Sequence, residues 1–179
     1  LQDTDPVVIH GYTSAQGDIE VRKLLADSVN RRFDTSFGPD NFYVSVGAAA
    51  ALCCCLNGLC NKDDEVIVFA PYFPEYKVFI EGAGAKMNLI PADTEAFQID
   101  FEKFEAAINE NTKAVIVNSP NNPCGVVYSH ETCTKLAEIL NAKSAELGHP
   151  IYLIADEPYR EIVFDGIEVP YLPKYYNNT

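Results

Sequence analysis

The chain contains two short apolar runs that are each followed at once by polar side chains, and this pattern constrains the fold most. Residues 114–117 are Ala-Val-Ile-Val and lead into Asn-Ser-Pro-Asn-Asn-Pro-Cys-Gly at 118–125. Residues 151–154 are Ile-Tyr-Leu-Ile and lead into Ala-Asp-Glu-Pro-Tyr at 155–159. Such runs predict buried strands of a parallel sheet, and open α/β sheets bind ligands beyond the carboxyl ends of their strands. The two motifs are therefore predicted to face one ligand site.

Helical and strand patterns alternate along the rest of the chain. The expected helices cover residues 18–33, 48–56, 75–81, 100–108 and 130–147, and the other expected strands cover 41–46, 66–69 and 86–90. The predicted apolar face of the first helix consists of Val21, Leu24, Leu25, Ser28 and Val29. This alternation favours right-handed crossovers and a mainly parallel sheet with helices on both faces. The predicted fold class is α/β, a three-layer α/β/α arrangement, with residues 1–179 as a single domain.

Length and charge narrow the classes of partner. A chain of 179 residues is long enough to bury a core, and its net charge of −13 argues against nucleic acid and anionic membrane surfaces. No apolar run approaches the roughly 20 residues that span a bilayer. We therefore expect a cytoplasmic protein that binds neither nucleic acid nor membrane. The chain begins at Leu1 with neither a Met nor a signal-peptide pattern, so we expect that Leu1 is not the native start.

The cysteines do not predict a metal site. The six are Cys53, Cys54, Cys55, Cys60, Cys124 and Cys133. Three of them are consecutive on a predicted helix, where successive side chains point about 100° apart and cannot converge on one ion. We expect them to be reduced, small apolar residues that pack a buried helix, and we expect no metal.

Together the motifs resemble the cofactor-binding core of the fold-type I, pyridoxal-phosphate-dependent aminotransferases of class I/II. The residues at 121–125 match the family's N-P-x-G motif, and those at 156–159 match D-x-x-Y. Tyr12, Gly17 and Arg22 resemble its Y-x4-G-x3-LR element, with valine in place of the leucine. The resemblance covers nearly the whole chain, in the family's order, and implies part of the large domain of that fold.

The resemblance assigns the polar motif residues to pyridoxal 5′-phosphate. Asp156 matches the aspartate that hydrogen-bonds the ring nitrogen, which keeps the ring protonated and able to accept electrons. Asn122 matches the asparagine that donates to the phenolate oxygen of the cofactor, and Tyr159 matches the tyrosine that hydrogen-bonds the same oxygen. Asp156 and Tyr159 are the implied catalytic residues. Cys124 stands where the family usually has a threonine.

Further residues resemble the family's remaining cofactor contacts. Gly47, Ala48 and Ala49 match its phosphate loop, where the free N–H groups of a helix N-terminus bind an anion. Phe73, within Pro-Tyr-Phe-Pro-Glu-Tyr at 71–76, falls where an aromatic ring stacks on the pyridine. Tyr12 matches the tyrosine that reaches the phosphate of the partner subunit. This last match implies a homodimer with a shared active site.

Some parts of the family pattern are absent from residues 1–179. The Schiff-base lysine is expected shortly after Thr179, and the C-terminal small domain, with the arginine that binds the substrate carboxylate, is also missing. Lys174 follows D-x-x-Y but lacks the serine-rich context of that lysine. We therefore expect the chain to be a fragment that is inactive alone.

The leading functional hypothesis is transfer of an amino group between an amino acid and a 2-oxo acid by the intact protein. A pyridoxal-phosphate-dependent carbon–sulfur β-lyase shares every motif present. A non-catalytic aminotransferase-like sensor domain of a transcription regulator is a further alternative, which a DNA-binding module upstream of Leu1 would support.

Overall fold

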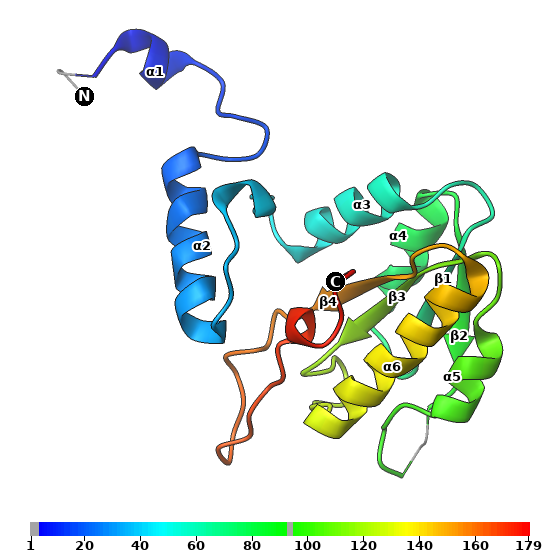
Figure 1. Ribbon diagram of the computed structural model, residues 1–179. Helices are drawn as coiled ribbons and strands as arrows, with labels where there is room; N and C mark the ends of the chain where they lie inside the picture. The colour runs from blue at the N-terminus through cyan, green and yellow to red at the C-terminus, as the bar shows by residue number, and fades with distance from the viewer. Residues whose placement is uncertain (1–3, 93–94) are drawn as a thin grey trace. The chain divides into compact units, whose positions relative to one another are not determined.

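The computed structural model describes residues 4–92 and 95–179 (Figure 1). Their contacts group the chain into two compact units, Leu1–Ala50 and Ala51–Thr179. The larger unit carries the sheet, and the smaller unit is helical. The assignment of residues 1–179 to a single domain stays a prediction.

The sheet has four parallel strands in the order β2-β1-β3-β4. The strands are β1 (Glu65–Phe69), β2 (Lys86–Ile90), β3 (Thr112–Asn118) and β4 (Tyr152–Asp156). β3 and β4 pair from Ala114 opposite Tyr152 to Asn118 opposite Asp156. The two apolar runs of the sequence therefore form neighbouring strands, and their carboxyl ends lie at one edge of the sheet, as predicted.

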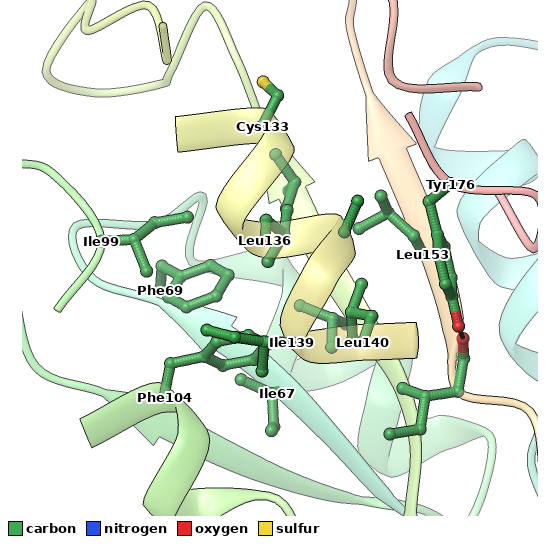
Figure 2. Close-up of a cluster of buried hydrophobic side chains, with 14 of the residues drawn as sticks. Ile67, Phe69, Ile99, Phe104, Cys133, Leu136, Ile139, Leu140, Leu153 and Tyr176 are labelled. Atoms are coloured by element: carbon green, nitrogen blue, oxygen red, sulfur yellow. Dashed lines mark hydrogen bonds between the residues drawn. The ribbon is translucent and has the colours of Figure 1, made fainter. Parts of the chain in front are cut away.

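Helices cover both faces of this sheet. They are α3 (Ala48–Leu59), α4 (Glu75–Gly82), α5 (Phe101–Ala107) and α6 (His130–Leu147), and a short 3-10 helix, η2, spans Leu172–Lys174. Side chains of α5 and α6 share one buried cluster with Ile67, Val115 and Leu153 (Figure 2). Side chains of α3 and α4 share the other cluster with Val66, Val68, Ala114 and Ile116. Alternate strand residues thus face opposite helical layers, which confirms the three-layer α/β/α arrangement.

The boundaries of α6 follow from local chemistry. Ser129 caps its first turn, because its Oγ accepts a hydrogen bond from the Thr132 N–H at 3.1 Å. Gly148 ends it in the left-handed conformation, with φ of 74°, which side chains disfavour. The predicted helix over residues 130–147 is confirmed at both ends.

The smaller unit contains α1 (Pro6–His10), α2 (Ile19–Phe33) and a 3-10 helix, η1 (Pro39–Asn41). The apolar face predicted for α2 is wrong: Val21, Leu24 and Leu25 are 46%, 69% and 41% exposed. Its buried residues are Arg22 and Ala26 instead. The reason is a polar contact, since Arg22 donates to the Pro39 carbonyl of η1 at 3.0 Å and to the Gly17 carbonyl at 3.3 Å.

The strand predicted over residues 41–46 does not form. Phe42 has an extended backbone, with φ of −116° and ψ of 134°. A strand also needs a neighbouring strand for its ladder of hydrogen bonds, and the described part of the chain assigns none to this segment.

The outer edge of β4 borders a hollow of about 680 Å³. Cys54 and Cys55 of α3 line it together with Asn178 and Thr179, and the Leu153 N–H of β4 donates to the Asn178 carbonyl at 2.8 Å. None of the predicted site residues lines this hollow. All six cysteines are free, but Cys54 and Cys55 are exposed, which corrects the expectation that the α3 cysteines are buried.

Candidate active site at the carboxyl ends of β3 and β4

The site begins with the last residues of two paired strands. Asn118 ends β3 and Asp156 ends β4, and the two lie opposite one another in the parallel register. The Asn118 Nδ2 donates to the Asp156 main-chain carbonyl at 2.8 Å. The Asn118 Oδ1 accepts from the Asn122 N–H at 2.7 Å. Residues of both motifs are therefore joined at one end of the sheet.

The Asp156 carboxylate has a buried tyrosine as its partner. Tyr76 of α4 is 1% exposed, and its hydroxyl donates a hydrogen bond to Asp156 Oδ2. Burial raises the pKa of Asp156 above its ordinary value, and the Tyr76 hydrogen bond opposes this by stabilising the ionised form. Burial and, as the second contribution, the hydrogen bond to Asp156 raise the pKa of Tyr76 above its ordinary value. This phenol therefore remains a hydrogen-bond donor.

Tyr76 was not among the residues that the motifs single out. Its signal in the sequence is its place at the end of the Pro-Tyr-Phe-Pro-Glu-Tyr segment, three residues after Phe73 and in the first turn of α4. In the structure the rings of Phe73 and Tyr76 meet edge to face, with centroids 5.6 Å apart and planes at 78°. Phe73 is thus packed beside the tyrosine that holds Asp156.

Asn122 and Tyr159 also come together. They follow β3 and β4, and the Asn122 Nδ2 lies 3.4 Å from the Tyr159 hydroxyl, within hydrogen-bonding distance. Both line a hollow of about 460 Å³, whose other wall includes Ile162, Phe164 and Ile167. An amide and a phenol therefore open onto one concave surface.

The loop between β3 and α6 is held by its own side chains. The Asn121 Nδ2 donates to the Pro71 carbonyl at 3.1 Å, and its Oδ1 accepts from the Cys124 N–H at 3.2 Å. The Cys124 Sγ donates to the same Oδ1 at 3.0 Å. The cysteine thus supplies a weak donor where the family usually has a threonine hydroxyl.

The other predicted site residues belong to the smaller unit. Gly47 precedes α3 with φ of 97°, a conformation that favours glycine, and Ala48 and Ala49 form the first helical turn. Tyr12 lines a hollow of about 440 Å³ together with Gly17 and Arg22, so the three residues of the Y-x4-G-x3-LR element share one surface.

A carboxylate, an amide and a phenol thus gather beyond the carboxyl ends of two parallel strands, where α/β proteins with open sheets bind their ligands. Comparison with known proteins gives the family. Residues 2–174 match the family model described as "Aminotransferase class I and II", so the chain belongs to that family. It is 34% identical to the probable kynurenine–oxoglutarate transaminase of Saccharomyces cerevisiae, over 89% of the chain and 37% of that protein.

Two more relatives agree with this assignment. The chain is 36% identical to the probable aspartate/prephenate aminotransferase of Thermus aquaticus, over 87% of the chain and 39% of that protein. An aminotransferase structure from Eubacterium rectale superposes with a TM-score of 0.95 and 57% identity, over 99% of the chain and 45% of that structure. The chain therefore spans less than half the length of these relatives.

The Tyr76 hydrogen bond gives a test of how Asp156 is tuned. In Tyr76→Phe we expect the pKa of Asp156 to rise further, because the donor that lowers it is lost while burial remains. Carboxyl ¹³C chemical shifts followed against pH measure this. Tyr176→Phe is the matched control, because Tyr176 is equally buried and its hydroxyl donates to the Ile151 carbonyl, just before β4. An equal rise in the pKa of Asp156 in both variants would show that Tyr76 has no specific effect on it.

Arg160 gives a test of the loop that carries Tyr159. Its guanidinium pairs with Glu157 and donates to the Val169 and Pro170 carbonyls, each at 2.7 Å. We expect Arg160→Gln to lower the free energy of unfolding by about 2 kcal/mol, because these acceptors lose charge-assisted partners. Lys77→Gln, which breaks an exposed pair with Glu81, should change it by less than about 0.5 kcal/mol. Urea unfolding measures both, and equal effects would contradict the clamping role of Arg160.

Proposed function

We propose that the complete polypeptide transfers an amino group between an amino acid and a 2-oxo acid, with pyridoxal 5′-phosphate as cofactor. The observation that carries this proposal is the Asp156 carboxylate at the end of β4, held by Tyr76. The pair of Asn122 and Tyr159, which follows the same two strands, supports it. Membership of the aminotransferase family supports amino-group transfer specifically, where the geometry alone would indicate only a ligand site.

The donors present fit this cofactor in chemical type. When bound, pyridoxal phosphate supplies an electron-accepting ring for the charge that develops at the substrate α-carbon. Asp156 would hold the proton of the ring nitrogen, because a nearby carboxylate favours the charged pyridinium. Asn122 and Tyr159 would donate hydrogen bonds to the phenolate oxygen, and Phe73 would supply the aromatic side chain for the ring face.

Gly47, Ala48 and Ala49 are the residues that would hold the phosphate group. The first N–H groups of α3, from Ala48 onward, have no acceptors within the helix, and the helix dipole favours an anion there. Gly47 allows the backbone turn that leads into them. Tyr12 would serve the phosphate of a second subunit, so we propose a homodimer, and we propose the cytoplasm as its location.

Proton transfer at the substrate needs a base that these residues do not supply. Asp156 is committed to the ring nitrogen, and Asn122 and Tyr159 act as hydrogen-bond donors. Lys174 is exposed on η2 and follows the D-x-x-Y motif without the serine-rich context of the family lysine. We propose that the lysine lies in the remainder of the polypeptide.

The proposal is tested with a polypeptide that extends through the length of its relatives. Purified with pyridoxal phosphate, it should form glutamate from 2-oxoglutarate when aspartate, alanine or kynurenine is supplied. Cystathionine is the discriminating substrate, because a β-lyase releases pyruvate and ammonia from it. Release of pyruvate and ammonia without amino transfer would show that the reaction is elimination. If the polypeptide consumes neither the amino donors nor cystathionine, the proposal of an enzymatic role is refuted.

A further inference from the structure

Asn118 occupies the point where the two motifs meet. It is 6% exposed at the end of β3, and both halves of its side-chain amide are used. The Oδ1 accepts the N–H of Asn122 at 2.7 Å, and the Nδ2 donates to the main-chain carbonyl of Asp156 at 2.8 Å. One side chain therefore links the main chain of the N-P-x-G loop to the main chain of the D-x-x-Y loop.

These two hydrogen bonds fix the main chain from which the functional side chains extend. The bond to Asn122 closes a turn of five residues, 118–122, which fixes where the Asn122 side chain begins. The bond to Asp156 holds the last peptide of β4, where the segment leading to Tyr159 starts. The two loops that are anchored in this way carry the Asn122 Nδ2 and the Tyr159 hydroxyl, which lie 3.4 Å apart.

Aspartate, leucine and alanine each fail to reproduce both bonds. Aspartate accepts but, when ionised, cannot donate, and leucine has the volume but neither group. Alanine leaves both main-chain groups without the partner that they have here. Since buried polar groups without partners are costly, the loops are expected to rearrange in any such variant.

We infer that Asn118 is a positioning residue for the proposed reaction, which sets the two donors of the cofactor's phenolate oxygen through main-chain hydrogen bonds. This inference rests on the proposed function. Asn118 itself reaches neither the reacting atoms nor the cofactor in this role. Its effect is exerted through Asn122 and Tyr159.

The test is a pH titration of the absorption of bound pyridoxal phosphate in the complete polypeptide. Asn118→Ala should move the midpoint upward by roughly half to one pH unit, because weaker donors stabilise the phenolate less. Asn109→Ala is the matched control: its amide donates to Glu65 Oε2 at 2.9 Å and accepts from the Asn111 N–H at 2.9 Å, at the opposite end of β3. The control should leave the midpoint unchanged while losing a comparable set of hydrogen bonds.

A double-mutant cycle with Asn122→Ala separates positioning from general destabilisation. Because Asn118 acts through both Asn122 and Tyr159, Asn118→Ala should cause a smaller shift in the Asn122→Ala background than it causes alone. A full additional shift in that background, or an equal shift in Asn109→Ala, would overturn the inference. If Asn118→Ala does not fold, Asn118→Ser goes through the same cycle under the same criteria. An unsubstituted protein that neither binds the cofactor nor transfers amino groups would instead refute the proposed function.

Discussion

Asp156→Asn in the complete polypeptide is expected to lower turnover by roughly 10²–10³-fold while leaving the fold intact. An amide cannot hold a proton on the ring nitrogen as a carboxylate does, so the ring would accept electrons less well. The fold should persist, because the asparagine Oδ1 can still accept the hydrogen bond of Tyr76. Steady-state rates with saturating substrate and cofactor measure the loss. Asp64→Asn, which removes a half-buried carboxylate that accepts the Asn61 N–H, is the matched control.

The same substitution should stabilise the chain at neutral pH. Burial raises the pKa of Asp156 in the folded state above 3.8, its ordinary value, so the folded state binds the proton more tightly than the unfolded state. Stability is therefore lost as pH rises from the unfolded pKa through the folded pKa. Asp156→Asn removes this loss, and its advantage in urea unfolding should grow from pH 3 to pH 7. Unchanged turnover would refute the assigned role of Asp156, whatever the stability.

The pattern of the sequence was sufficient for the layered fold. The apolar runs before Asn118 and Asp156 predict β3 and β4 because buried parallel strands are continuously apolar. Ser129 and Gly148 delimit α6 because capping is local chemistry, which depends on residues within one helical turn. Such short-range signals are complete in the sequence itself.

Long-range polar pairings were not predictable in the same way. Tyr76 and Asp156 are 80 residues apart, and nothing local indicates that their side chains meet. Asn118 is conspicuous only as part of a motif, whereas its link to Asp156 depends on the register of two strands. The expected apolar face of α2 failed for a related reason, since a polar contact of Arg22 decided which face was buried.

Residues 1–179 alone are expected to show no transamination and no borohydride-stable adduct at one preferred lysine. Only an unprotonated amine attacks the cofactor aldehyde, and neighbouring carboxylates favour the protonated form of two described lysines. The hydrogen bond from Lys86 to Asp63 and that from Lys143 to Glu146 raise the pKa of each amine. Lys23, Lys77 and Lys103 pair with nearby carboxylates.

The side chains that are expected to contact the cofactor also place no particular lysine beside it. In the described residues, Asp156, Asn122 and Tyr159 form hydrogen bonds with tyrosine, asparagine and main-chain groups, and none of these bonds involves a lysine. Titration with pyridoxal phosphate, reduction with borohydride and peptide mass spectrometry should therefore give low labelling spread over several lysines. Stoichiometric labelling of a single lysine, or amino transfer by the purified chain, would show that residues 1–179 hold the reactive amine, and would contradict its assignment to the rest of the polypeptide.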